Sequence, residues 1–292
     1  MIVARTPAEI RAAVAALPRP LGFVPTMGAL HTGHQALAAR ARAENAAVAA
    51  SIFVNPLQFG PGEDFNRYPR AFAGDCAALE ATGVAVVFAP SVETMYPATF
   101  ATSIDVGDVA KGYEGSLRPG HFRGVATVVT KLFTLVQPDR AYFGAKDAQQ
   151  CVVIRRLVRD LELPVSIVVS ATIREADGLA LSSRNVYLTP AERAAAPALH
   201  RALDVLAEAI ARGDDDRDAA FARARALLVA PLREAYLDVV DPVRFAPAPA
   251  LRGPAIAIGS AWLGTTRLLD NIGVAGADGR DPLVTEAQAA RV

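Results

Sequence analysis

The sequence predicts an α/β protein whose first domain holds a parallel sheet and whose smaller second domain is α+β. In the first half of the chain, short apolar runs alternate with helical patterns, and those runs are nearly continuous. Such strands are buried on both faces, as in a parallel sheet covered by helices. Past about Ile173 the pattern changes to two Ala-rich helical stretches followed by closely spaced strand-like runs. That spacing favours a small antiparallel sheet with helices.

The expected elements follow the chain in order. Strands are expected at residues 21–24, 48–54, 84–89, 140–143 and 165–170, and helices at 7–17, 34–44, 70–82, 122–136 and 148–161. In the second half, helices are expected at 190–212 and 217–234, and strands in YLDVV, AIAIGSAWL and TRLLDNI. A first domain of residues 1–172 and a second of 173–275 result. Residues 276–292 lack periodicity and are expected to form a disordered tail.

Composition excludes several classes of protein. Lys+Arg and Asp+Glu both total 30, so the net charge does not indicate a nucleic-acid partner. The two cysteines, Cys76 and Cys151, form no metal-binding spacing and fit a reducing cytoplasm. No apolar run reaches the roughly 18 residues of a membrane helix. Only three of the 30 basic residues are lysines, which draws attention to Lys146 as a site for a compact ammonium group.

The stretch PTMGALHTGH joins an expected strand to an expected helix. Thr32 and Gln35 match a capping box, so the helix is expected to begin near Gly33. Glycines let the backbone approach a ligand, and the first N–H groups of the helix form an anion site. His31 and His34 would then donate to phosphate oxygens. Two alternatives remain open: a capped helix with two surface histidines, and a zinc site completed by His121.

Three further stretches place polar groups near strand ends or the domain junction. Gln58 follows the strand in SIFVNPLQFG, and an amide there could bind a small hydroxy acid or stabilise a turn. Lys146, Asp147 and Gln150 follow another strand, where a lysine suits a phosphate. The loop LALSSRN offers two serines and an arginine. His200 is expected to be structural. Neither a Walker P-loop nor GxGxxG is present.

Together these stretches resemble the pantoate–β-alanine ligase family. PTMGALHTGH is similar to that family's version of the His-x-Gly-His signature of nucleotidyltransferases. FVNPLQF, RPGHFRGVATVVTKLF, FGAKDAQQ, DGLALSSRNVYL and LGTTRLLDN match in the family's order. The resemblance covers roughly residues 1–275. It implies a Rossmann-like nucleotide-binding domain, a smaller C-terminal lid domain, a homodimer, and synthesis of pantothenate from ATP, pantoate and β-alanine with Mg²⁺, through a pantoyl adenylate.

The resemblance also implies roles for individual residues. Gln58 and Gln150 would bind pantoate, and Gln58 would border the β-alanine site. His34 would donate a proton, with His31 and Lys146 as the other catalytic residues. The residues expected to bind ATP are Met27, Gly28, Ala29, Leu30, His31, Thr32, Gly33, His34, Gly144, Ala145, Lys146, Asp147, Ile173, Leu181, Ser182, Ser183 and Arg184.

The chain departs from the family at two positions. Ala145 and Ala148 stand where the family usually has Glu and an aromatic residue, which removes side-chain support from Lys146. No motif identifies the Mg²⁺ ligands, and Asp75 is the candidate from the sequence. Two other functions stay open at this point. One is a nucleotidyltransferase that stops at an adenylyl product, and the other is a nucleotide-binding regulator without turnover.

Overall fold

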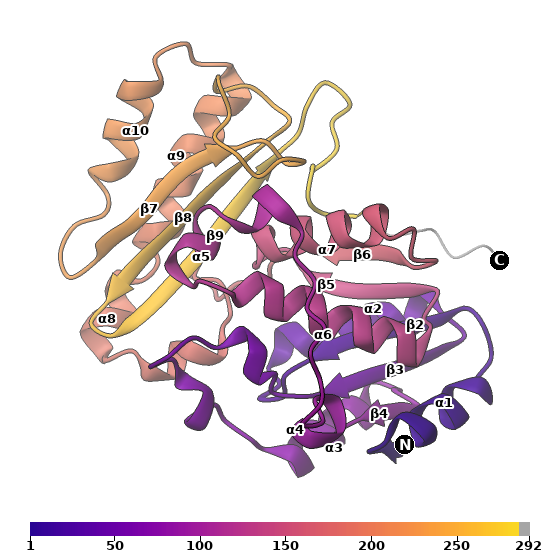
Figure 1. The fold of residues 1–292 in the computed structure, drawn as a ribbon. Helices are drawn as coiled ribbons and strands as arrows, with labels where there is room; N and C mark the ends of the chain where they lie inside the picture. The colour runs from indigo at the N-terminus through magenta and orange to yellow at the C-terminus, as the bar shows by residue number, and fades with distance from the viewer. Residues whose placement is uncertain (286–292) are drawn as a thin grey trace. The chain divides into compact units, whose positions relative to one another are not determined.

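The structure is a computed structural model that describes residues 1–285 (Figure 1). These residues group into two compact units. The first contains residues 1–144 and 153–170, and the second contains residues 145–152 and 171–285. The turn after Gly144, which we expected in the first domain, therefore groups with the second unit.

The first unit is built on a six-stranded sheet in which every neighbouring pair is parallel, as predicted. The strands are β1 (Ile2–Ala4), β2 (Leu21–Thr26), β3 (Ala47–Ile52), β4 (Val86–Phe88), β5 (Arg140–Gly144) and β6 (Ser166–Ser170), in the order β1-β4-β3-β2-β5-β6. The three-residue edge strand β1 was not expected from the sequence. The strand order reverses between β2 and β5, and ligands of such sheets bind outside the carboxyl ends of the strands at this point.

Helices of the first unit pack around this sheet. They are α1 (Pro7–Ala15), α2 (Thr32–Glu44), α3 (Phe72–Ala81), α4 (Val92–Met95), α5 (Glu114–Leu117) and α6 (His121–Val136), with 3-10 turns η1 (Pro56–Gln58), η2 (Asp64–Asn66) and η3 (Gly107–Ala110). Helix α2 packs against β2, β3 and β5, and α1 packs against α6. Helix α7 (Ala148–Asp160) contributes residues to both units.

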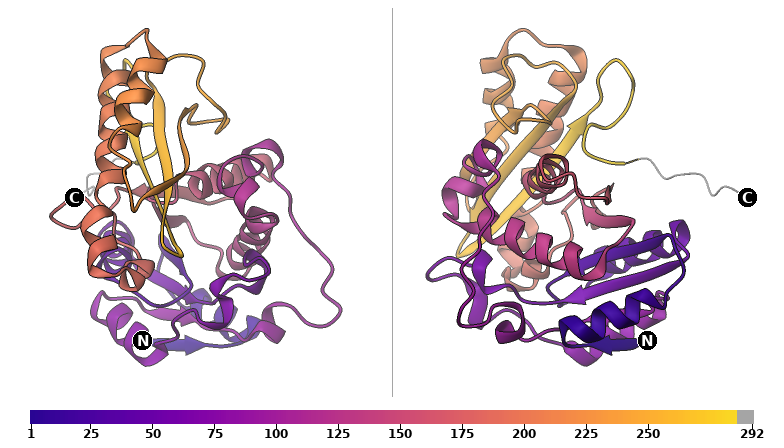
Figure 2. Two further views of the ribbon diagram at one scale, coloured as in Figure 1. Left: turned by 90° about the vertical axis from the view of Figure 1, so that its left-hand side faces the viewer. Right: turned by 45° about the vertical axis from the view of Figure 1, so that its right-hand side comes forward.

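The second unit holds an antiparallel sheet of β7 (Arg233–Val240), β8 (Ala255–Leu263) and β9 (Thr266–Val274), as the strand spacing predicted. Its other elements are η4 (Ser183–Tyr187), α8 (Pro190–Ala195), α9 (Ala198–Arg212) and α10 (Arg217–Arg225). Helix α9 packs on β8 and β9, and α10 packs on α9 (Figure 2). Apolar residues between α9, α10 and the sheet, among them Leu203, Leu206 and Val239, are fully buried.

Two helix predictions in this unit were too long. The stretch 190–212 is two helices, because the chain breaks between Ala195 and Ala198, where Pro197 lacks a backbone donor. The helix expected to reach residue 234 ends at Arg225, ahead of Pro231 and β7. Residues 276–285, which we expected to be disordered, form an irregular segment in which Leu283 is only 1% exposed. The rest of the expected tail, 286–292, lies outside the described residues. Within residues 1–285, none of the helices combines the length and apolar character needed to cross a membrane.

Candidate active site

The loop that follows β2 is shaped by local hydrogen bonds. Thr26, the last residue of the strand, donates its hydroxyl to the carbonyl of Ser51 at 2.6 Å and accepts the N–H of Gly28 at 3.2 Å. Gly28 and Ala29 both adopt positive φ, at +81° and +51°. Ala29 is not a glycine, so its left-handed conformation must be held by its surroundings.

Asp75 of α3 holds this strained loop. Its Oδ2 accepts the N–H of Ala29 at 2.9 Å, and its Oδ1 accepts the N–H of Leu30 at 2.8 Å. The carboxylate is buried, with the residue 4% exposed. We expected Asp75 as a candidate Mg²⁺ ligand, but the structure gives both of its oxygens backbone partners. Its visible task is to fix the loop.

The two histidines of the motif cap helix α2. The helix begins at Thr32 with His31 as its N-cap, so the prediction that Thr32 is the capping residue was wrong by one position. The Nδ1 atom of His31 accepts the N–H of Gly33 at 3.1 Å, and Nδ1 of His34 accepts the N–H of His31 at 3.4 Å. An imidazole replaces the Ser or Thr that usually fills this position.

This capping arrangement decides where the protons lie. In a neutral imidazole, one ring nitrogen accepts and the other carries the hydrogen. Because Nδ1 accepts in both His31 and His34, Nε2 is the donor atom of each. The two ring centroids are 4.1 Å apart. A pair of N–H donors thus stands at the positive end of a helix, a combination that suits an anion.

Gly33 is required by the packing of this cap. A Cβ at Gly33 would lie 2.9 Å from Cε1 and Nδ1 of His31. Such a contact would push the His31 ring off its hydrogen bond. The backbone of this loop is therefore adapted to the imidazoles and not only to a ligand.

Gln58 lies at the end of η1, and its side-chain amide has a fixed orientation. Asn55 accepts the N–H of Leu57 with Oδ1 and donates Nδ2 to the carbonyl of Gly124, which sets its two ends. Asn55 Nδ2 also donates to Gln58 Oε1 at 2.9 Å. The hydroxyl of Tyr96 donates to Asn55 Oδ1 at 2.8 Å. Gln58 is consequently left with its Nε2 donors for a substrate oxygen.

A second cluster holds the backbone of Gln58. His121 donates Nδ1 to the Gln58 carbonyl at 2.8 Å, and Arg118 donates Nη2 to the same oxygen at 3.2 Å. Arg118 also forms a two-bond ion pair with Glu63, each bond 2.7 Å long. Burial and the nearby Arg118 charge lower the pKa of His121 to about 4, so this imidazole is neutral. His121 lies with Gln58 here and does not complete a zinc site: among residues 1–285, no three His, Cys, Asp or Glu side chains are grouped to hold a metal.

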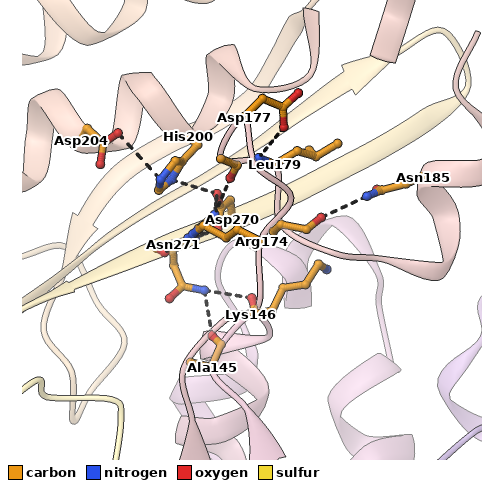
Figure 3. A network of polar contacts seen from close by, with 12 residues as sticks. Ala145, Lys146, Arg174, Asp177, Leu179, Asn185, His200, Asp204, Asp270 and Asn271 are labelled. Atoms are coloured by element: carbon orange, nitrogen blue, oxygen red, sulfur yellow. Dashed lines mark hydrogen bonds and ion pairs between the residues drawn. The ribbon is translucent and has the colours of Figure 1, made fainter. Parts of the chain in front are cut away.

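The turn that carries Lys146 belongs to the second unit (Figure 3). Asn271 of β9 donates its Nδ2 hydrogens to the carbonyls of Ala145 and Lys146, both at 2.8 Å. Asp147 is exposed and directly precedes α7, where its carbonyl accepts the N–H of Cys151 at 3.0 Å. Gln150 is half-buried in the first turn of α7.

The remaining expected ATP contacts lie in neighbouring segments of the same unit. The N–H of Leu181 donates to the carbonyl of Ile173 at 3.0 Å. Ser182 caps η4 by accepting the N–H of Arg184 at 3.2 Å. Both serines and Arg184 are partly exposed. His200 of α9, expected to be structural, has its Nδ1 3.3 Å from Asp270 Oδ2.

Comparisons with known proteins identify the family. The profile of the Pantoate-beta-alanine ligase family matches residues 2–273. The chain belongs to this family. The "Pantothenate synthetase" of Roseiflexus sp. (strain RS-1) is 55% identical over 273 residues, which span 93% of this chain and 98% of that protein.

Solved structures agree with this assignment. The pantothenate synthetase of Thermus thermophilus superposes with a TM-score of 0.89 at 51% identity, covering 94% of this chain and all of that one. A pantoate-beta-alanine ligase from Francisella tularensis, complexed with Beta-gamma ATP and Beta-alanine, gives a TM-score of 0.76 at 33% identity over 94% of this chain and 97% of its own. The chain is thus an enzyme of the ligase class, and a nucleotidyltransferase that stops at an adenylyl product is not favoured.

Several residues that hold the candidate site residues in place were not assigned a role from the sequence. Asn55 and Asn271 lie inside stretches that we quoted, FVNPLQF and LGTTRLLDN, and their chain positions alone do not reveal their partners. Tyr96 and Glu63 lie in loops without a motif. Only the folded structure brings Asn271 to Lys146, because 125 positions separate them in the sequence.

Proposed function

We propose that this chain condenses (R)-pantoate with β-alanine to pantothenate, with ATP converted to AMP and diphosphate. Membership of the pantoate–β-alanine ligase family supports the reaction. Among the features of the chain itself, the observation that carries the proposal is the double imidazole cap of α2. It leaves Nε2 as the donor atom of both imidazoles at the positive end of a helix, a combination that suits a phosphate.

The chemistry has two steps. A carboxylate does not form an amide with an amine at neutral pH without activation. One carboxylate oxygen of pantoate therefore attacks the α-phosphorus of ATP, and the bond to the β-phosphate breaks. Diphosphate leaves. The amine of β-alanine then attacks the acyl carbon of the adenylate, loses a proton, and AMP leaves with the electron pair of the broken acyl–oxygen bond.

The residues act in this scheme mainly by positioning and by charge. His31 and His34 donate Nε2–H to phosphate oxygens, with His34 as the proton donor, and the ammonium of Lys146 offsets the charge of the transferred group. The residues 27–34, 144–147, 173 and 181–184 contact ATP. Gln58 and Gln150 bind pantoate through amide groups, and Gln58 borders the β-alanine site.

Mg²⁺ fits this scheme as a companion of the nucleotide. Residues 1–285 contain no group of three His, Cys, Asp or Glu side chains that could hold a metal ion. Mg²⁺ commonly binds through phosphate oxygens and keeps several waters. It would supply charge neutralisation on the phosphates.

We further propose a homodimer in the cytoplasm; sedimentation should then give twice the 30.6 kDa mass of the chain.

Isotope exchange tests the two-step reaction directly. With pantoate and Mg²⁺ present and β-alanine absent, labelled diphosphate should enter ATP, because the first step reverses while the adenylate stays bound. Omitting pantoate should abolish the exchange. Lys146→Ala should reduce exchange and overall turnover alike, by about 10²–10³, the scale for loss of one preorganised charge contact.

Two results would contradict the proposal. ADP and phosphate as products would mean attack at the γ-phosphorus and an acyl phosphate intermediate. Exchange that requires β-alanine would leave the residue roles in place, but it would replace the stepwise order with a ternary reaction.

A further inference from the structure

Asn271 makes an unusual contact with the turn that carries Lys146. Its two Nδ2–H groups donate to the carbonyls of Ala145 and Lys146, each at 2.8 Å. These carbonyls belong to the peptide groups on either side of the Lys146 Cα atom. Fixing both peptide planes fixes the two backbone dihedrals of Lys146, and with them the direction of its side chain.

Among residues 1–285, Asn271 is the side chain seen to hydrogen-bond the turn that carries Lys146. Ala145, which precedes it, is 4% exposed and carries only a methyl group. Within residues 1–285 no carboxylate forms an ion pair with the Lys146 ammonium, as the ion pairs of this unit involve other side chains. The direction of the lysine is therefore set through its backbone.

Asn271 is itself held firmly in place. Its N–H donates to Asp270 Oδ1 at 2.8 Å, and its carbonyl accepts Arg174 Nη2 at 3.2 Å. Asp270 accepts both Nη1 and Nη2 of Arg174, at 2.6 Å and 2.9 Å (Figure 3). This two-bond geometry is the most directional that an Arg–carboxylate pair can adopt.

The groups around Asp270 keep this pair ionised in spite of burial, and burial makes the pair costly to break. Burial alone would raise the pKa of Asp270, but the nearby His200 imidazole and Arg174 outweigh it, and the pKa of the carboxyl is lowered. Removing one partner of a buried pair leaves the other charge uncompensated. The Arg174–Asp270 pair therefore fixes the position of Asn271, which hydrogen-bonds the Lys146 turn.

The same pair connects the other proposed ATP contacts of this unit. Arg174 directly follows Ile173, and its Nη1 also donates to the carbonyl of Gly178 at 3.1 Å. The Ile173 carbonyl in turn accepts the N–H of Leu181, at the start of the serine loop. The Lys146 turn, the stretch from Ile173 to Leu181 and strand β9 are thus connected through the Arg174–Asp270 pair.

We propose that Asn271, held by the Arg174–Asp270 ion pair, is the positioning residue of Lys146 in the adenylation step. The inference rests on the proposed function, in which Lys146 offsets phosphate charge. Asn271 does not touch the substrates. It acts through the backbone of Lys146. The stretch LGTTRLLDN, which resembles the family, would thus serve to position this lysine.

The test is the diphosphate exchange of Asn271→Ala, alone and combined with Lys146→Ala. The single variant should lose about 10- to 100-fold in exchange rate, with the KM for pantoate unchanged within about twofold. In the Lys146→Ala background the second substitution should cost almost nothing, because its effect passes through a side chain that is already gone. A purely structural role would instead multiply the two losses.

Matched variants protect this test. Asp238→Asn weakens another Arg–Asp pair of the same unit, more exposed and with a single bond, in which Arg217 Nη2 donates to Asp238 at 2.6 Å, and it should leave exchange unchanged. If Asn271→Ala does not fold, as judged by circular dichroism, Asn271→Ser can replace it because serine retains a donor. This variant should show a smaller loss of exchange rate, again with an unchanged KM for pantoate. Multiplied losses, or full exchange in Asn271→Ala, would overturn the inference. Absence of pantoate-dependent exchange in the unmodified enzyme would instead reject the proposed function.

Discussion

His31 and His34 cap α2 besides making the phosphate contacts that we propose, and this capping role could not be predicted from the sequence. The spacing of the motif predicted an anion site at a helix N-terminus. That each Nδ1 atom is consumed by capping, which leaves Nε2 as the donor, depends on backbone geometry. The sequence likewise suggested Asp75 as a metal ligand, because the hydrogen-bond partners of a carboxylate cannot be known from the sequence alone. Its two backbone hydrogen bonds appear only in the folded loop.

Replacement of Asp75 separates these two readings. In Asp75→Asn only one side-chain oxygen remains to accept, so one of the N–H groups of Ala29 and Leu30 loses its partner. Hydrogen bonds to charged groups contribute about 1.5–3 kcal/mol, and turnover should fall roughly 10- to 100-fold as the loop loosens. The Mg²⁺ concentration for half-maximal rate should not change. A large rise in that concentration would restore Asp75 as a metal ligand.

Replacement of Gln58 tests the orientation of its amide. With Oε1 occupied by Asn55, the Nε2 group is the part offered to pantoate. Gln58→Ala should therefore raise the KM for pantoate by about 10- to 100-fold, equivalent to roughly 1–3 kcal/mol for lost hydrogen bonds in a buried site. The KM for ATP should stay within about twofold. Unchanged pantoate kinetics would remove Gln58 from the site.

At the scale of elements, the contact of η1 with α6 determines where Gln58 lies. Helix α6 approaches the η1 backbone at Gly124, and a Cβ there would overlap the carbonyl group of Leu57. The periodicity of residues 122–136 predicted the helix correctly to within one residue. The periodicity could not predict the close contact between Gly124 and η1, because a helical pattern does not show which segment packs against a glycine.

Two glycine substitutions test this contact as a matched pair. Gly124→Ala forces η1 away from α6, and overpacking of this kind costs about 1–3 kcal/mol. It should lower the melting temperature and raise the KM for pantoate. Gly74→Ala, inside α3 with no atom within 4 Å of the added Cβ, should stabilise the protein by up to about 1 kcal/mol and leave that KM unchanged. Equal behaviour of the two variants would show that the close approach is unimportant.

For the whole molecule, the fold class was predictable because apolar strands and helical periods are local signals. The parallel sheet and the separate antiparallel sheet both follow from them. The assignment of each segment to a unit depends on packing instead. Residues 145–152 follow a strand of the first unit, yet they group with the second, to which Asn271 binds them. No pattern in the sequence indicates that residues 145–152 group with the second unit.

Stability of the whole chain should depend on pH through His121. Its pKa is about 4 in the folded protein and about 6.5 in an unfolded chain, so between these values the unfolded chain binds a proton that the folded one does not. Stability is therefore complete above about pH 6.5 and decreases as the pH falls, by about 3 kcal/mol in total near pH 4. His121→Asn retains a donor for the Gln58 carbonyl but cannot be protonated.

Urea unfolding between about pH 5 and pH 6.5 isolates this effect. The half-buried Glu63 and the buried Asp270 reduce the stability of the protein only at lower pH. Arg118 holds the pKa of Glu63 below its usual range despite partial burial, and His200 and Arg174 do the same for Asp270. Across this interval the free energy of unfolding should rise with pH in the unmodified chain and stay nearly constant in His121→Asn. Parallel curves for the two proteins would mean that His121 is solvated and takes up its proton in the folded state. In that case its hydrogen bond would not hold Gln58 as the structure indicates.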